Sequence, residues 1–420
     1  MVDSLRFDRW CSAFVDASCL LALCAASSLS CGGTSERDKS SSGPMSGASG
    51  SGSGASGPGT AGTAGFESIG GAGGLAGSGG TSPVGRMCSH AVVPPPALPA
   101  AGVTKLPCDI FGEESGPCVA AHSTVRSLYA TYDGPLYQVK KQDGTTLDIA
   151  PAVPGGFANA ANQDAFCGTE ACTISIVFDQ SGQGNHLTRS LGGGPEPVIA
   201  HEAIANARPA KFGAHAVYGL RIDPGIGYRN NDACGTALGD DPETEYMVVS
   251  GSYYNAGCCF NYGNIESSNH NDGEGSAEAI YFGNCTTWNK GDGAGPWVMA
   301  DLENGLWAGN MSPYSHNTSL SLAFVTAMVK GDSYGRNHWT IKHGDAQFGP
   351  LVTPFDGTRP SQRYRYMIKQ GAIGLGIAGD GSAAGRGEFF EGAMTARYST
   401  NAADDAVHAN IVTVYGAPQP

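Results

Sequence analysis

From about residue 88 onward, apolar residues occur in short alternating runs with turn residues on either side, for example at 173–178, 246–249, 279–282 and 323–329. A period of two is typical of strands that bury one face. Segments with a helical period are scarce outside residues 119–128 and the last dozen residues. The pattern predicts an all-β sandwich of antiparallel strands with little helix.

The first 31 residues have the pattern of a bacterial export signal. Arg6 and Arg9 precede an apolar run that is too short for a permanent membrane span, and small residues follow it. Cys31 resembles the lipid-acceptor cysteine of a bacterial lipoprotein. A plain secretory signal is the alternative, because Leu29 lies one place nearer Cys31 than the usual pattern has it.

Residues 32–86 consist mainly of Gly, Ser, Ala and Thr. Such a segment cannot bury enough apolar surface to offset its loss of conformational entropy, so we expect a disordered tether. The globular composition of residues 88–420 contains no further linker and no repeat. We therefore predict one domain, held away from a surface by the tether.

The charge balance excludes one class of partner. The chain has 38 acidic and 24 basic residues, a formal net charge of −14. Binding to nucleic acid needs a basic patch, so we expect no nucleic-acid partner and instead a soluble exported monomer acting on neutral polymers. The ten His residues lack ligand spacing, and His186 is expected to be a structural loop residue. We predict no metal and no cofactor.

Nine cysteines follow the tether, a density that indicates an oxidising compartment. Short spacings favour the bridges Cys108–Cys118 and Cys167–Cys172. The adjacent pair Cys258 and Cys259 can either bond to each other or form two separate long-range bonds. Because the number is odd, we expect at least one free thiol among Cys88, Cys234 and Cys285, or one bond that the residues alone leave unassigned.

Two acids stand out in the run at 296–305. Asp301 and Glu303 are two residues apart in what reads as a strand, so both should lie on one face, with Trp297 and Trp307 nearby. Paired carboxyl groups beside aromatic rings are what cleavage of a glycosidic bond requires. A solvated strand face that happens to carry two acids is the alternative.

Two other motifs match formally but lack the required context. Residues 374–379 satisfy GxGxxG, yet a loop follows where a dinucleotide site needs a helix. Residues 331–335 satisfy GxSxG, yet a returning strand follows where a nucleophile elbow needs a helix. We interpret the second as a hairpin turn.

The strongest signal is a resemblance over roughly residues 105–416 to the α-L-arabinofuranosidases of glycoside hydrolase family 54. It is carried by ADLENGLW at 300–307, GCCFNYGN at 257–264 and GIAGD at 376–380, with further matches at 118–124, 179–187 and 227–231. The resemblance implies a jelly-roll β-sandwich, similar to the concanavalin type. It also implies an exo-acting enzyme that removes terminal non-reducing α-L-arabinofuranosyl residues from arabinan or arabinoxylan with retention of configuration.

The resemblance further assigns residue roles. Glu303 corresponds to the nucleophile and Asp380 to the general acid/base. The implied substrate-binding positions are Asp301, Asn304, the backbone at Gly379, Trp288, and a vicinal Cys258–Cys259 disulfide that with Trp288 forms an apolar wall for the furanose ring. The two local bridges are also implied. A non-catalytic surface lectin on the same scaffold is the competing hypothesis, since one fold can host both functions.

Two departures from the family pattern are visible. Fungal members carry a C-terminal arabinose-binding β-trefoil domain with no counterpart here, so we expect weaker binding to polymers, for which surface tethering can compensate. Gly305 stands where many fungal members have Asn, so we expect one substrate contact to be absent.

Overall fold

The computed structural model describes residues 88–194, 199–332 and 336–416. The predicted export signal, the tether and Cys31 lie outside the described residues. None of the helices within the described ranges has the length and apolar character needed to cross a membrane.

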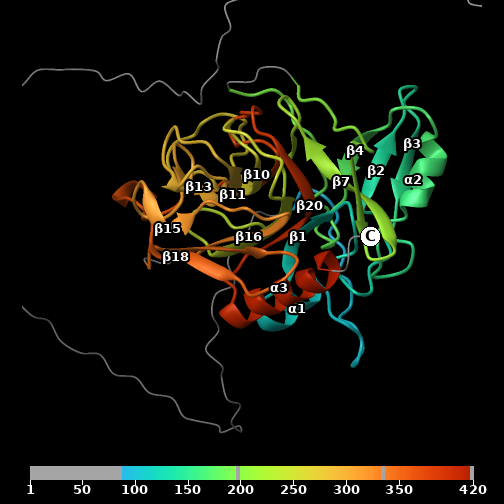
Figure 1. Ribbon diagram of the computed structural model, residues 1–420, viewed down its shortest axis with the longest axis horizontal. Coiled ribbons are helices and arrows are strands. Elements are labelled where there is room, and N and C mark those ends of the chain that lie inside the picture. The colour runs from blue at the N-terminus through green and yellow to red at the C-terminus, as the bar shows by residue number, and fades with distance from the viewer. Residues whose placement is uncertain (1–87, 195–198, 333–335, 417–420) are drawn as a thin grey trace, which may run out of the picture.

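Two large sheets make up the molecule (Figure 1). The first has the order β18-β17-β16-β9-β20-β7-β6, with β1 also paired to β20. Its strands are β1 (Cys118–Ser123), β6 (Arg208–Phe212), β7 (His215–Ile222), β9 (Glu243–Ser250), β16 (Phe324–Gly331), β17 (His338–Asp345), β18 (Val352–Thr358) and β20 (Gly387–Thr395). All of its described pairings are antiparallel.

The second sheet has the order β14-β13-β11-β10-β19-β8-β5-β4-β2-β3 and is also antiparallel. Its strands are β2 (Tyr137–Lys140), β3 (Thr146–Ile149), β4 (Thr173–Val177), β5 (Leu187–Arg189), β8 (Tyr228–Asn230), β10 (Asn261–Ile265), β11 (Glu278–Gly283), β13 (Trp297–Asp301), β14 (Leu306–Trp307) and β19 (Ala372–Leu375). The short strands β12 (Gly291–Asp292) and β15 (Tyr314–Thr318) form a separate parallel pair.

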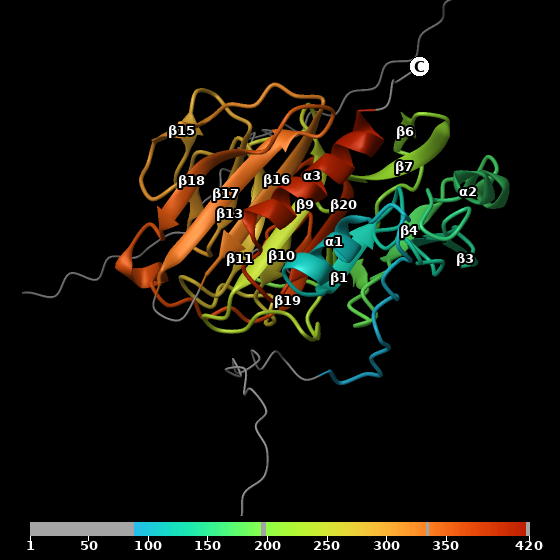
Figure 2. The ribbon, with the colours of Figure 1, turned by 90° about the horizontal axis from the view of Figure 1, so that it is seen from below.

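The core lies between the two sheets, where β9, β16 and β17 pack against β10, β11 and β13. Every residue of β9, β16 and β20 is buried. These strands are covered on both faces: the second sheet packs on the inner face, and α1 (Pro107–Glu114) and α3 (Asn401–Tyr415) lie side by side over the outer face of the first sheet (Figure 2). The predicted all-β sandwich is confirmed.

The four alternating runs lie in β4, β9, β11 and β16, as predicted. The helical period assigned to residues 119–128 was wrong, because this segment is β1 followed by a turn. All six residues of β1 are buried. A strand buried on both faces has no polar side, so its apolar pattern cannot be distinguished from that of a buried helix. The helical period near the end of the chain corresponds to α3.

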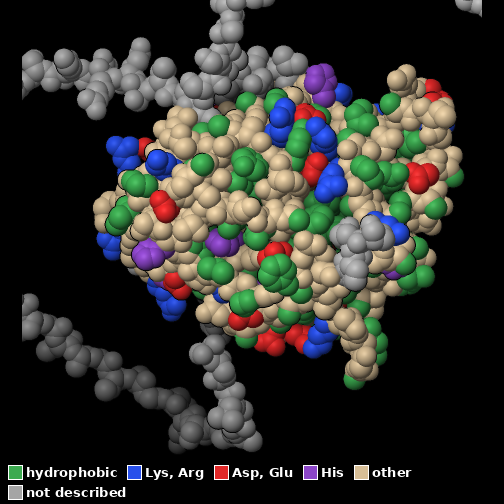
Figure 3. All heavy atoms as spheres, in the orientation of Figure 1, with side chains coloured by type: hydrophobic (Ala, Val, Ile, Leu, Met, Phe, Trp, Pro, Cys, Tyr) green, Lys and Arg blue, Asp and Glu red, His purple; other side chains and the backbone are tan. Residues whose placement is uncertain are grey.

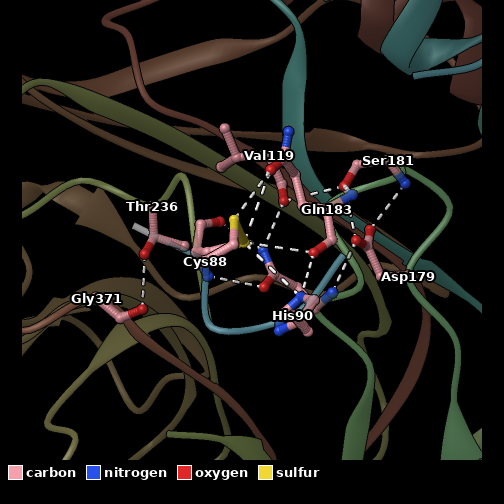
Figure 4. The surroundings of a disulfide bond; sticks show 10 residues. Cys88, His90, Val119, Asp179, Ser181, Gln183, Thr236 and Gly371 are labelled. Atoms are coloured by element: carbon pink, nitrogen blue, oxygen red, sulfur yellow. Dashed lines mark hydrogen bonds between the residues drawn. A yellow bond between two sulfur atoms is a disulfide. The ribbon is translucent and has the colours of Figure 1, made fainter. Parts of the chain in front are cut away.

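Four disulfides occur in the described residues. Cys108–Cys118 joins α1 to β1, and Cys167–Cys172 closes the end of α2 (Ala160–Cys167). Cys88–Cys234 joins residues 146 positions apart (Figure 4). The sequence left this bond unassigned, because no short spacing points to it. This number of bonds indicates a protein of an oxidising compartment.

The loop that begins at Asp179 lies beside the Cys88–Cys234 bond (Figure 4). The Asp179 carboxylate accepts hydrogen bonds from Ser181 N–H at 2.9 Å and from Asn185 N–H at 3.0 Å. The Nδ1 atom of His186 accepts from Asp179 N–H at 3.0 Å. This histidine is therefore part of the loop's internal hydrogen bonding.

On the face shown in Figure 3, acidic and basic side chains lie singly or in small groups, some of which contain both signs, separated by neutral surface.

Candidate active site

The turn between β13 and β14 carries Glu303. The strand ends at Asp301, and Glu303 and Asn304 both have left-handed backbone conformations, with φ of 56° and 54°. The expectation that Asp301 and Glu303 share one strand face was therefore wrong, because Glu303 lies in the turn and no longer follows the alternation of a strand. The turn itself brings the two acids together, since Glu303 N–H donates to Asp301 Oδ1 at 3.1 Å.

Hydrogen bonds from two directions hold this turn. Leu302 N–H donates to Gly305 O at 3.1 Å across it. The hydroxyl of Tyr364, which lies in the short 3-10 helix Gln362–Tyr364, donates to Glu303 O at 3.1 Å. Gly305 has no space for a side chain, because an added Cβ would lie 2.3 Å from Trp307 Nε1.

Asp301 is buried, and each of its two carboxyl oxygens accepts one hydrogen bond within the protein. Its Oδ2 accepts from Asn261 Nδ2 at 2.8 Å, and Asn261 begins β10, two strands away in the same sheet. Burial, reinforced by the negative charge of Glu266, raises the pKa of Asp301 to about 7. The Asn304 side chain is exposed and exchanges hydrogen bonds with that of Asn271.

A third carboxyl group, that of Glu266, joins these acids although the sequence did not single it out. Glu266 follows β10 directly, is fully buried, and accepts from Ser276 Oγ at 2.7 Å. It also lies within hydrogen-bonding reach of the Glu303 carboxyl. Its position two residues after the matched segment 257–264 was the one available signal.

Asp380 lies in the loop between β19 and β20. Its carboxylate accepts from Ser382 N–H at 2.8 Å and from Ser382 Oγ at 3.1 Å, which closes a tight turn. Gly379 precedes it at a point of close approach, because a Cβ there would lie 1.5 Å from Glu266 Oε2. Asp380 is thereby brought to the same cluster as Glu266 and Glu303, and its charge acts on both.

The electrostatics of the cluster follow from burial of several acids together. Burial, then the charges of Glu266 and Asp301, raises the pKa of Glu303 far above the ordinary range of a glutamate. Burial likewise raises the pKa of Glu266. Carboxylates this close cannot all ionise, so the free protein retains at least one proton here at neutral pH.

The disulfide between Cys258 and Cys259 borders the cluster. Both residues pack with Trp288 and Ala378 in one apolar group. Ala384 N–H donates to Cys258 O at 2.9 Å, so the disulfide segment is fastened to the loop that carries Asp380. The two sulfurs and an Asp301 oxygen lie within 4.8 Å of one another, but sulfurs in a disulfide are not thiolate ligands for a metal.

Comparison with known proteins identifies the family. The family model described as "Alpha-L-arabinofuranosidase B, catalytic" matches residues 107–416. The chain belongs to this family. It is 51% identical over 315 residues to the probable α-L-arabinofuranosidase B of Aspergillus fumigatus, covering 73% of this chain and 61% of that protein. It is 48% identical over 333 residues to the α-L-arabinofuranosidase of Hypocrea jecorina, covering 77% and 65%.

Solved structures of the same family are similar to this chain. A family 54 α-L-arabinofuranosidase soaked with a cyclic sulfate inhibitor superposes with a TM-score of 0.71 and 45% identity, covering 73% of this chain and 65% of that one. An arabinofuranosidase complexed with arabinofuranosyl-α-1,2-xylobiose gives 0.70 and 44%, with the same coverage. The chain thus spans a little under two thirds of the length of these relatives.

Proposed function

We propose that this protein is an exo-acting, retaining α-L-arabinofuranosidase. Its substrates would be polysaccharides or oligosaccharides of the arabinan and arabinoxylan type that end in non-reducing α-L-arabinofuranosyl residues. The observation that carries the proposal is the meeting of the Glu303 turn and the Asp380 loop in one carboxyl cluster, bordered by the Cys258–Cys259 disulfide; Glu266, Asp301 and Glu303 are buried there and Asp380 is half-buried. Family membership and the names of the relatives support it.

The proposed chemistry assigns one role to each acid. Glu303 attacks the anomeric carbon while Asp380 protonates the leaving oxygen, and Asp380 then removes a proton from the water that hydrolyses the glycosyl ester. Asp301, Asn304 and the Gly379 backbone would bind the sugar hydroxyls. Glu303 must be ionised to attack; the developing positive charge of the transition state favours that form, and Glu266 can take the proton.

The apolar group of Cys258, Cys259 and Trp288 would pack against the furanose ring. Sugar rings carry apolar C–H faces, so such a wall orients the ring while the carboxylates bind its hydroxyls.

The direct test is release of nitrophenol from p-nitrophenyl α-L-arabinofuranoside by residues 88–420. We expect Glu303→Gln to lose activity by at least about 10⁴-fold. Asp380→Asn should still release a first burst of nitrophenol, because nitrophenol leaves without protonation, but its steady-state turnover should be slow, because Asp380 is also the base for hydrolysis of the glycosyl ester. Asp143→Asn, in an exposed hairpin turn, is the matched control and should behave as wild type. Methanol trapping should give the α-methyl furanoside. Binding of arabinose without hydrolysis would instead mean a lectin.

We also propose the arrangement of the whole chain: an export signal at 1–31, a tether at 32–86 and a catalytic domain at 88–420, acting as a monomer outside the cytosol. The disulfides support export. The proposal includes attachment of a lipid at Cys31. Mass spectrometry of the mature N-terminus, with Cys31→Ser as control, tests it, and light scattering tests the monomer.

A further inference from the structure

Arg229 is a buried arginine whose guanidinium binds main-chain carbonyl groups. It lies at the centre of β8 and is 4% exposed. Its Nη1 donates to Gly379 O at 3.1 Å, and its Nη2 donates to Glu266 O. Its Nε donates to Asn231 Oδ1 at 2.6 Å, which sets the plane of the guanidinium.

The two carbonyl groups belong to the two loops that carry the acids. Gly379 directly precedes Asp380, and Glu266 contacts Glu303. β8 is the neighbour of β19, with Arg229 opposite Gly374, so the guanidinium extends from the sheet to both loops. Because these hydrogen bonds reach the backbone, they determine where each loop runs, whatever the protonation of the carboxyl groups.

The guanidinium also brings a positive charge to the acidic cluster. The nearest charged groups that face it are Glu266 after β10 and Asp380 in the β19–β20 loop. Burial lowers the pKa of Arg229 to about 10, so it remains charged at neutral pH. A cation at this place favours the ionised form of each carboxyl group around it.

We propose that Arg229 is a positioning residue for the reaction, holding the Asp380 loop at its working distance from Glu303 and setting the pH range over which the cluster is active. This inference rests on the proposed function. The competing explanation is an ordinary buried arginine that contributes only to stability.

Two substitutions separate the two parts of this role. Arg229→Lys keeps the charge but cannot reach both carbonyl groups, so kcat on the aryl arabinofuranoside should fall about 10- to 100-fold, with KM little changed and both limbs of the pH profile unmoved. Arg229→Gln also removes the charge. Both limbs should then move to higher pH by about one unit, because each carboxyl group holds its proton more strongly.

A milder variant covers the case in which these proteins fold poorly. Asn231→Ala leaves Arg229 in place but frees the guanidinium to rotate, so kcat should fall a few-fold with unmoved limbs. Arg126→Lys is the matched control at another buried arginine, which binds the Glu391 carboxylate. It should lower the melting temperature and leave the pH profile and kcat unchanged.

The outcomes are distinct. Inactive wild-type protein would refute the proposed function itself. Active wild type with an Arg229→Gln profile that is merely lower, at the same pH optimum, would show that the arginine is structural and overturn this inference. The same conclusion would follow if Arg229→Lys and Asn231→Ala both kept wild-type kcat while folded by circular dichroism.

Discussion

Gly379→Ala probes the closest packing in the site. A Cβ at residue 379 would lie 1.5 Å from Glu266 Oε2, whereas real contacts essentially never fall below 3.0 Å. The two groups must therefore move apart by at least 1.5 Å in total. Glu266 is fully buried and holds Ser276 Oγ at 2.7 Å, so it has little room to retreat.

The cost follows from these contacts. Overpacking costs about 1–3 kcal/mol, and loss of a hydrogen bond to a buried carboxyl group adds about 1.5–3 kcal/mol. We expect Gly379→Ala to lower the free energy of unfolding by about 2.5–6 kcal/mol. A displacement of this size beside the nucleophile should also lower kcat/KM by about 100-fold.

Urea unfolding and aryl arabinofuranoside hydrolysis measure the two effects. Gly112→Ala is the matched control, because that glycine lies in α1 and an added Cβ meets only a Leu98 methyl group at 3.7 Å. It should be neutral or slightly stabilising. The reasoning would be refuted if Gly379→Ala changed stability by less than about 0.5 kcal/mol and retained wild-type kcat/KM.

Three further predictions concern separate parts of the molecule. Burial lowers the pKa of His343 to about 4, so between pH 6.5 and 4 the unfolded chain binds a proton more readily than the folded protein, and stability should fall as the pH falls through that window. Urea unfolding at pH 7.5 and 4.5 measures the loss of unfolding free energy, which should be about 2–3 kcal/mol smaller in His343→Gln than in wild type. Replacing both Cys258 and Cys259 by serine should raise KM about 10-fold through loss of the apolar wall, seen in Michaelis–Menten kinetics. Cys88→Ser should cost about 2–5 kcal/mol in urea unfolding with kcat unchanged, because the Cys88–Cys234 bond closes a long loop.

Each of these has a contrary outcome. If the stability of wild type and His343→Gln depended equally on pH, this histidine would bind a proton as readily in the folded protein as in the unfolded chain. An unchanged KM in the double serine variant would show that the Cys258–Cys259 disulfide does not contact the sugar. The control is the double variant Cys167→Ser with Cys172→Ser, because that bond closes the end of α2. A large loss of kcat in Cys88→Ser would show that its disulfide supports the site as well as the fold.

Local pattern predicted the strands well. Short runs rich in Val, Ile, Tyr and Phe between turn residues located β4, β9, β11 and β16, because β-branched and aromatic residues favour strands. β9, β11 and β16 are buried on both faces, as β1 is, but the sequence CVAAHS of β1 has fewer such residues, and a helix was wrongly predicted there. The acid at 303 was found for a partly wrong reason: its spacing from Asp301 suggested a strand face, but two left-handed residues turn the chain there. Asn adopts that conformation comparatively readily, but Glu rarely does so unless surrounding contacts hold it, as the Tyr364 hydroxyl does at Glu303 O.

By itself, the sequence determined the strand-rich class from residue pattern and pointed to Asp301 and Glu303 from their spacing, whereas the family and the assignment of Asp380 came from the resemblance of whole segments to family 54. Only the tertiary structure decided that Glu266 belongs with them and that Arg229 joins two distant loops. Arg229 lies within the matched segment 227–231 and Glu266 lies two residues after the segment 257–264, but nothing in these local sequences indicates which distant groups either side chain contacts. Their roles arise when neighbouring strands β8, β10 and β19 bring separate loops together at one place, and that neighbourhood exists only in the folded sheet.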